Sequence, residues 1–281
     1  MSHVLIAGCG YVGTELAIRL RDQGHTAWCI RRSVEKLPEG VEPMQGDLSR
    51  PDSLPALPSE VDHVVYCAGA GGFEESKYRA TYIDGPKNLL GALGKVGSKP
   101  KRIIFTSSTG VYHQANGDWV DEQSPTKPDG FSGKAMLEGE QTILESGPAS
   151  YVVRFGGIYG PGRDRLIRSV RDGTTATPAD ASYLNLIHRN DCARTLEHLL
   201  FSDAAPGIYI GVDNEPTDRR ELYAWIADQL GVERSKTSGE PATSGRTARS
   251  NKRCANAKLR NSGFEFDYPT YREGLQRLIG D

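Results

Sequence analysis

The stretch His3-Val4-Leu5-Ile6-Ala7-Gly8-Cys9-Gly10-Tyr11-Val12-Gly13 decides the fold, because an apolar run breaks into the spacing G-x-G-x-x-G and a helical pattern follows. A strand, a tight turn and a helix are the context in which this spacing indicates a dinucleotide site. Gly8 permits the sharp turn, Gly10 lets a pyrophosphate approach the backbone, and Gly13 lets the helix pack closely on the strand. We therefore expect the segment to bind a cofactor through Gly8, Gly10, Tyr11, Val12 and Gly13.

The composition is that of an ordinary globular protein. The chain has 281 residues, of which 37% are hydrophobic and 25% charged, and its formal net charge is −2. This length allows one large domain or a domain with a smaller lobe. The charge argues against nucleic acid or an acidic membrane surface as the main partner. The sequence has no run of 18 apolar residues and no signal-peptide pattern, so we expect a cytoplasmic protein. We expect it to be a monomer or homodimer.

Cysteine and histidine spacing predicts no metal site. The five cysteines are widely spaced and form no CxxC pair, and the six histidines show no zinc-like spacing. We interpret the cysteines as small buried thiols. A redox-sensing Cys9 beside the cofactor is the alternative.

Strand-like and helical patterns alternate through the first 155 residues. The predicted strands are 3–8, 25–30, 41–45, 62–67, 101–106 and 150–154. The predicted helices are 12–23, 50–57, 75–94 and 132–145. Such alternation is typical of an α/β protein with a doubly wound parallel sheet, whose ligand lies at the carboxyl ends of the strands.

The pattern changes after residue 155. The turn-rich segment 156–162 is not expected to continue a strand or a helix. Beyond it we predict helices at 163–172, 190–202, 218–230, 255–261 and 270–279, strands at 184–187 and 207–211, and loops at 173–182 and 234–250, the second of them mobile. The expected organisation is a Rossmann-type NADP-binding domain of residues 1–155 with about 184–202. About 156–183 and 203–281 form a small, discontinuous C-terminal substrate lobe that closes over the cofactor.

A basic pair follows the second predicted strand. Arg31 and Arg32 precede Ser33, and no acid stands at the tip. In a dinucleotide-binding fold an acid at this position favours NAD, whereas arginine accommodates a 2′-phosphate. Two guanidiniums beside a hydroxyl form a forked site for a phosphate dianion. We therefore expect NADP rather than NAD, the alternative being two solvated surface arginines.

Two further strand ends carry residues suited to the cofactor. Asp47 and Leu48 follow the third strand, and we expect Asp47 to accept a hydrogen bond from the adenine amino group. Cys67, Ala68 and Gly69 end the fourth strand with small residues against which a cofactor can lie.

These pieces resemble the short-chain dehydrogenase/reductase superfamily, in its extended NAD(P)-dependent epimerase/dehydratase-like branch. The resemblance spans nearly the whole chain. It rests on the glycine turn and on four further segments, which are Gly46-Asp47-Leu48, the run from Ile104 to Tyr112, Arg154–Gly162 as R-x-x-x-x-Y-G-P-G, and Leu186–Asp191 as I-H-V-x-D.

One catalytic residue of that family is missing. The family uses a Ser or Thr after the fifth strand and a Tyr-x-x-x-Lys pair that opens the next helix. The resemblance assigns Ser108 to the serine role, Lys134 to the lysine role and Thr106 to the cofactor. Gly130 stands where the tyrosine belongs. The chain therefore resembles the atypical members, particularly the YeeZ-like group, which keep the cofactor fold and lack this tyrosine.

Other side chains are candidates for the open roles. Ser108 either orients a ligand or satisfies backbone donors at a strand end. Tyr112 and His113 are candidate proton donors, since histidine changes charge near neutral pH, and a structural role is the alternative for both. The resemblance places Tyr159 and Arg163 near the substrate.

Several of these residues have a structural interpretation as well. An ion pair of Arg163 with Asp164 or Asp191 would make its role structural. His188 and Asp191 are expected to fix the junction between the lobes, with Asp191 capping a helix.

Two functions remain open at this point. The first is an NADP(H)-dependent oxidoreductase or epimerase with a non-standard proton donor, acting on a small polar, anionic or sugar-like substrate between the lobes. The second is a catalytically silent NADP(H)-binding redox sensor or partner-binding protein. Lys134 favours the enzyme, whereas the missing phenol favours the silent protein.

Overall fold

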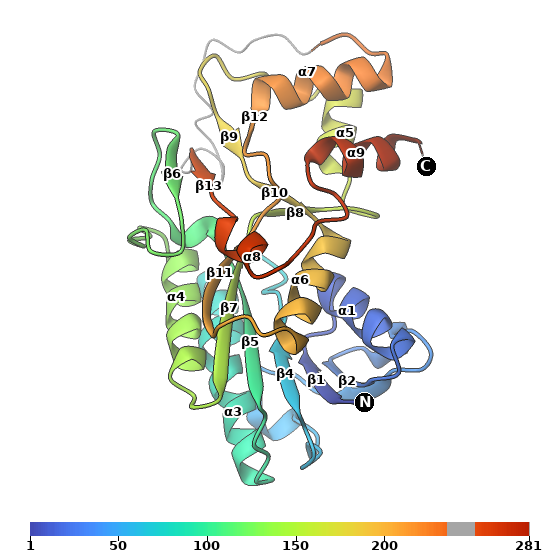
Figure 1. The fold of residues 1–281 in the computed structure, drawn as a ribbon, viewed down its shortest axis with the longest axis vertical. Coiled ribbons are helices and arrows are strands. Elements are labelled where there is room, and N and C mark those ends of the chain that lie inside the picture. Colours follow the sequence, from blue (N-terminus) through green and yellow to red (C-terminus); the bar gives the residue numbers. More distant parts are fainter. Residues whose placement is uncertain (235–250, 281) are drawn as a thin grey trace. The chain divides into compact units, whose positions relative to one another are not determined.

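A computed structural model describes residues 1–234 and 251–280 (Figure 1). It divides into two compact units. Unit 1 comprises Met1–Val111, Pro128–Arg154 and Cys192–Tyr209, and unit 2 comprises Tyr112–Lys127, Phe155–Asp191 and Ile210–Asp281. The predicted loop at 234–250 lies outside the described residues except for its first residue.

The centre of unit 1 is a seven-stranded sheet in the order β11-β7-β5-β4-β1-β2-β3. Neighbours from β5 to β3 pair in parallel. The strands are β1 (His3–Ala7), β2 (Thr26–Arg31), β3 (Glu42–Gln45), β4 (His63–Tyr66), β5 (Arg102–Ser108), β7 (Ala149–Phe155) and β11 (Gly207–Gly211). The strand order reverses between β1 and β4, which is where a doubly wound sheet binds ligands. The predicted Rossmann-type fold is confirmed.

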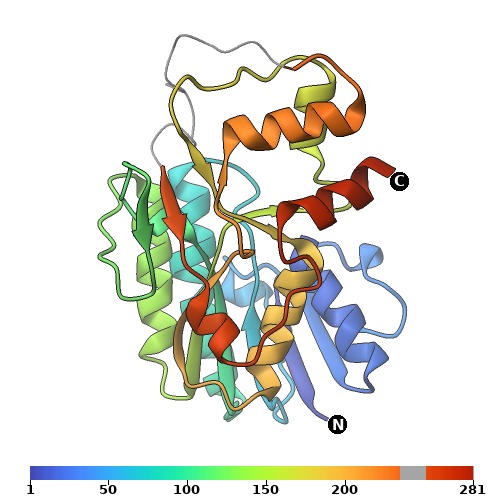
Figure 2. The same ribbon diagram turned by 45° about the horizontal axis from the view of Figure 1, so that its top comes forward.

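Helices cover both faces of this sheet (Figure 1 and Figure 2). The apolar side chains of β4 and β5 pack with those of α3 and α4 in one core, which also contains Leu5 of β1. Helix α1 buries a separate stripe, Leu16, Ala17 and Leu20, at helical spacing. The helices of these layers are α1 (Tyr11–Asp22), α2 (Glu75–Arg79), α3 (Gly85–Lys95), α4 (Phe131–Leu144) and α6 (Arg189–Phe201).

Two helices predicted in unit 1 differ from the structure, one in its length and the other in its continuity. The helix expected at 50–57 is a single turn, Pro51–Ser53, because prolines at 55 and 58 cannot donate backbone hydrogen bonds to a longer helix. The helix expected at 75–94 is divided by a wide π-helical turn at Ala80–Asp84. The Tyr66 hydroxyl donates to the Thr81 carbonyl in that turn. A side chain at Gly85 would collide with the same hydroxyl, so the chain bends around Tyr66.

Unit 2 is built from short strand pairs and helices. The pairs are β8 with β10, β9 with β12, and β6 with β13. A core of apolar side chains from α5, α7 and α9 includes Tyr159, Leu222 and Tyr271. The bounds are β6 (Asp118–Val120), β8 (Gly157–Tyr159), α5 (Arg165–Arg171), β9 (Tyr183–Leu184), β10 (Leu186–His188), β12 (Thr217–Asp218), α7 (Arg219–Leu230), β13 (Lys252–Cys254), α8 (Ala257–Asn261) and α9 (Tyr271–Gly280).

Two expectations for unit 2 are corrected. Strand β8 lies in the segment predicted to hold no strand, because Gly157 donates to the Asn185 carbonyl at 2.7 Å and Gly156 leaves no room for a side chain there. Asp191 lies inside α6 rather than capping it. Its carboxylate accepts from the backbone N–H groups of Asp267 and Tyr268, both at 2.9 Å, so it fixes the C-terminal segment.

No helix in residues 1–234 and 251–280 is both long and apolar enough to cross a membrane.

Candidate functional site

The three glycines of the first turn have different surroundings. Gly8 has φ +102°, and a Cβ there would lie 2.5 Å from the backbone of Ala68. A Cβ at Gly13 would lie 2.6 Å from the Gly8 carbonyl oxygen. A Cβ at Gly10 would meet no atom within 4 Å. Gly8 and Gly13 are therefore required by packing within the protein, whereas Gly10 faces open space at the N-terminus of α1.

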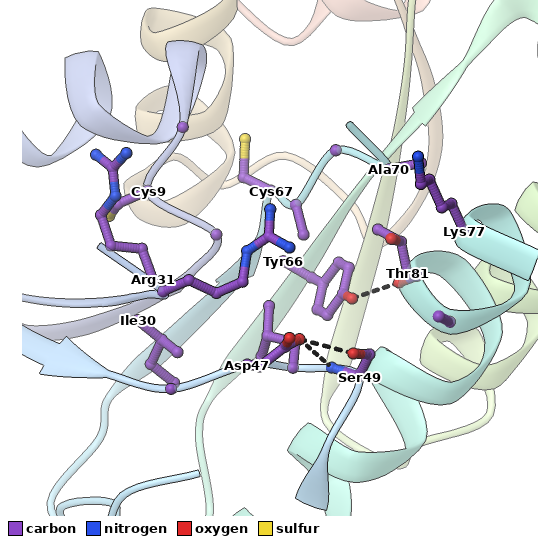
Figure 3. Close-up of a pocket in the computed structure, with 18 of the residues that line it drawn as sticks. Cys9, Ile30, Arg31, Asp47, Ser49, Tyr66, Cys67, Ala70, Lys77 and Thr81 are labelled. Atoms are coloured by element: carbon purple, nitrogen blue, oxygen red, sulfur yellow. Dashed lines mark hydrogen bonds between the residues drawn. The ribbon is translucent and has the colours of Figure 1, made fainter. Parts of the chain in front are cut away.

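That open space belongs to a cavity of about 330 Å³ at the carboxyl ends of β1, β2 and β4 (Figure 3). All of its lining residues lie in unit 1. They come from the glycine turn at 8–10, the strand ends at 30–33, 46–49 and 66–70, and Lys77, Ala80 and Thr81. The cavity lies where the strand order reverses, which is where a doubly wound sheet binds its ligand.

The cavity carries a positive charge. Its lining includes the cations of Arg31, Arg32 and Lys77 against the single carboxylate of Asp47. Neither arginine pairs with a carboxylate in the part of the chain that the structure describes. Ser33 also lines the wall. Two arginines and a serine therefore line the same part of the cavity.

Asp47 is held in place from within its own loop. Its Oδ1 accepts from the Ser49 backbone N–H at 3.0 Å and from the Ser49 hydroxyl at 2.7 Å (Figure 3). Partial burial opposes its ionisation, but these hydrogen bonds and the charge of Arg32 outweigh that effect and hold the pKa of the carboxyl below its usual value. The predicted hydrogen bond to adenine would have to use Oδ2.

The two cysteines that line the cavity, Cys9 and Cys67, differ in exposure. All five are thiols. Cys67 lines the cavity, and its side chain is half-buried. Cys9 is fully buried, and burial followed by its contact with Cys29 raises the pKa of its thiol. A buried, protonated thiol reacts slowly, which disfavours Cys9 as a redox sensor.

Some predicted cofactor residues lie elsewhere. Gly8 and Gly10 of the glycine turn, the predicted residues at the strand tips and those at 67–69 line the cavity. The exceptions are Tyr11, Val12, Gly13, Thr106 and Lys134. Lys77, Ser49 and Tyr66 are lining residues that the sequence did not indicate.

The turn after β5 and the start of α4 lie together. A Cβ at Gly133 would lie 3.3 Å from the Gly110 carbonyl oxygen. The Ser108 Oγ accepts from the Gly110 N–H at 3.1 Å, which satisfies a backbone donor and leaves the hydroxyl proton available. Lys134 follows in the first turn of α4 with an exposed side chain.

Position 130 could hold the family's tyrosine without backbone strain. Gly130 has φ −82° and ψ 153°, an extended conformation open to any residue. A Cβ there would meet only the Ser132 hydroxyl, at 3.9 Å. The absence of the phenol therefore does not follow from the geometry of this turn.

The candidate proton donors lie in unit 2 and differ in exposure. Tyr112 is 3% exposed, whereas His113 is exposed. His113 is therefore the more accessible of the two to a small molecule.

The two candidate substrate residues, Tyr159 and Arg163, also differ in exposure. Tyr159 is buried in the core of unit 2, and its hydroxyl lies against Gly274. Burial comes first among the causes that raise its pKa. Arg163 is exposed, and Asp164 pairs with Arg168 at 3.0 Å. Arg163 is therefore better placed than Tyr159 to meet a ligand.

His188 has a structural role in unit 2. Its ring lies 3.9 Å from that of Tyr268, and its Nδ1 accepts from the Asn190 N–H at 3.2 Å. Burial and the charges of Arg189 and Arg277 lower the pKa of His188 to about 4, so the ring is neutral at neutral pH.

Comparison with known proteins places this site in a family. A model described as the RmlD substrate binding domain matches residues 1–281. The chain belongs to that family. Protein YeeZ of Escherichia coli strain K12 is 28% identical over 96% of this chain and 97% of its own length. The predicted atypical short-chain dehydrogenase/reductase of the epimerase/dehydratase branch is confirmed.

Two solved structures extend the comparison. A Methylobacillus flagellatus protein described as an NAD-dependent epimerase/dehydratase is 39% identical, with a TM-score of 0.83 over 99% of this chain and 98% of that chain. The human epimerase family protein SDR39U1, solved with NADPH, is 20% identical with a TM-score of 0.78 over 99% of both chains. The human protein is similar in fold alone.

Proposed function

We propose that this protein is an NADP(H)-dependent oxidoreductase or epimerase that acts on a small polar substrate, anionic or sugar-like. The observation that carries the cofactor proposal is the cavity over Gly10. Its wall holds two arginines and a serine at the tip of β2. A nicotinamide cofactor would supply hydride transfer. The chain's own residues would then bind its phosphates, orient the carbonyl and move one proton.

The arginine pair supports NADP over NAD. A bidentate contact between charged groups contributes on the order of 2 kcal/mol, or about 30-fold in affinity. We expect the unmutated protein to bind NADPH about 30-fold more tightly than NADH, and the double variant Arg31→Ala, Arg32→Ala to lose most of that preference. Fluorescence titration with both reduced cofactors measures it.

A matched control removes the same charge elsewhere. Arg168 and Arg234 are exposed and pair with Asp164 and Asp228. Replacing both by alanine should leave the NADPH to NADH ratio unchanged. Equal or tighter binding of NADH by the unmutated protein would contradict the proposal.

The proton donor proposed here is His113. It is exposed and follows Ser108 by five residues in the sequence. Ser108 would orient the carbonyl, and Lys134 would bind the nicotinamide ribose. General acid catalysis typically contributes 10²- to 10⁴-fold in rate. In a screen of carbonyl metabolites with NADPH, His113→Gln should lower kcat by about that factor and leave cofactor affinity unchanged.

A silent NADPH-binding sensor remains the second candidate, because glycine stands at position 130. Gly130→Tyr distinguishes the two, since the backbone there accepts a side chain. If the acid is absent rather than replaced, the unmutated protein binds NADPH without turnover at any pH. Gly130→Tyr then creates carbonyl reductase activity. Turnover that is unaffected by His113→Gln would exclude His113 as the donor.

A further inference from the structure

One cation that lines the cavity, Lys77, has no role in the cofactor contacts proposed above. Arg31 and Arg32 account for a 2′-phosphate, and Gly10 with the start of α1 accounts for backbone contact with a pyrophosphate. Lys77 comes from another element, α2, and lines the same cavity (Figure 3). Figure 3 shows it on the opposite side of the cavity from Arg31.

The chain before α2 makes room for the Lys77 ammonium. Gly71 has φ +68°, a left-handed conformation that favours glycine in the loop after β4. A Cβ at Gly72 would lie 3.0 Å from Lys77 Nζ and 3.2 Å from its Cδ. The Lys77 side chain therefore lies close to the Gly72 backbone.

The partner of Lys77 can be displaced. Nζ lies 2.6 Å from Glu74 Oε1, and the two side chains are 46% and 60% exposed. An exposed ion pair at this spacing contributes little, because water screens both charges. A phosphate that enters the cavity can therefore take the ammonium from Glu74.

We propose that Lys77, which lies close to Gly72, is a second binding element for the pyrophosphate of the dinucleotide, opposite the first glycine turn. The proposal rests on the function proposed above. It separates two tasks within one cavity, because the arginines bind the 2′-phosphate and Lys77 binds the pyrophosphate. Lysine contacts phosphate as a point charge, so it tolerates movement of the group better than a bidentate arginine.

Binding of three ligands to two variants distinguishes pyrophosphate binding from 2′-phosphate binding. ADP-ribose carries the pyrophosphate without a 2′-phosphate, 2′-AMP carries only the 2′-phosphate, and NADPH carries both. Lys77→Met should weaken ADP-ribose and NADPH by the same factor, about 5- to 10-fold, and leave 2′-AMP unchanged. The Arg31→Ala, Arg32→Ala variant should show the opposite pattern, with 2′-AMP and NADPH weakened and ADP-ribose unchanged. Calorimetric titration at one fixed salt concentration measures all three.

Two further variants complete the design. Lys77→Arg should restore most of the ADP-ribose affinity. Lys87 is the control, because it is an exposed lysine paired with Glu138 at 2.9 Å and does not line the cavity. Lys87→Met should change none of the three affinities.

Each outcome bears on a distinct claim. ADP-ribose binding that Lys77→Met leaves unchanged, while NADPH still binds, overturns the role of Lys77 alone. A loss shared by 2′-AMP overturns the assignment to the pyrophosphate. An unmutated protein that binds neither NADPH nor ADP-ribose overturns the proposed function, and Lys77 with it.

Discussion

Gly10→Val is expected to lower NADPH affinity by at least about 100-fold, or ~2.7 kcal/mol, while the fold survives. The backbone at Gly10 has φ −89°, so a side chain there does not require the left-handed conformation that favours glycine. A new Cβ meets no protein atom within 4 Å. The valine methyl groups would instead fill the space in which the pyrophosphate must approach the turn. The variant therefore separates loss of binding from loss of structure.

The measurement pairs a binding titration with thermal unfolding. Gly10→Val should keep a Tm close to that of the unmutated protein without ligand and lose the increase in Tm that saturating NADPH causes. Gly8→Ala is the contrasting variant. Gly8 has a positive φ, and a new Cβ there would lie 2.5 Å from the backbone of Ala68. Both features predict a lower Tm before any ligand is added. Normal NADPH affinity in Gly10→Val would show that the cofactor does not cross this turn.

The parts that the sequence predicts well are those set by local rules. The glycine turn needs only a strand before it and a helix after it, and β1 and α1 are both present. The tip of β2 follows from strand length, which is why Arg31 and Arg32 line the cavity as expected. Neither prediction required knowledge of a distant contact.

The helix predicted at 50–57 was wrong for a local reason, the prolines at 55 and 58, but other errors come from contacts that link distant residues. The break between α2 and α3 depends on the hydroxyl of Tyr66, a strand residue about fifteen positions away. Strand β8 forms because it pairs with β10, and a glycine-rich segment carries no strand signal of its own. Lys77 was missed for the same reason, since only the folded sheet brings α2 to the cavity. Its cue was the Gly71-Gly72 pair shortly before a lysine.

Arg154 shows how a sequence motif can conceal a structural role. It begins the segment that resembles the family motif, yet its side chain is only 4% exposed and pairs with Glu140. Nε donates to Oε1 at 3.0 Å and an Nη donates to Oε2 at 2.7 Å. The hydroxyl of Ser107 donates to the same Oε1 at 2.5 Å. The three residues tie β7, α4 and β5 together inside unit 1.

Arg154→Ala is therefore expected to lower the free energy of unfolding by about 3–5 kcal/mol, because it leaves the Glu140 carboxylate buried without its cation. Urea unfolding followed by circular dichroism measures the change. Arg154→Met with Glu140→Leu should be less destabilising than the single variant, since it removes both charges and keeps the volume. Lys87→Ala breaks an exposed pair and should cost less than about 1 kcal/mol. If Arg154→Ala unfolds at the same urea concentration as Lys87→Ala, the buried pair does not hold the sheet to α4, and the motif position must be explained by the ligand instead.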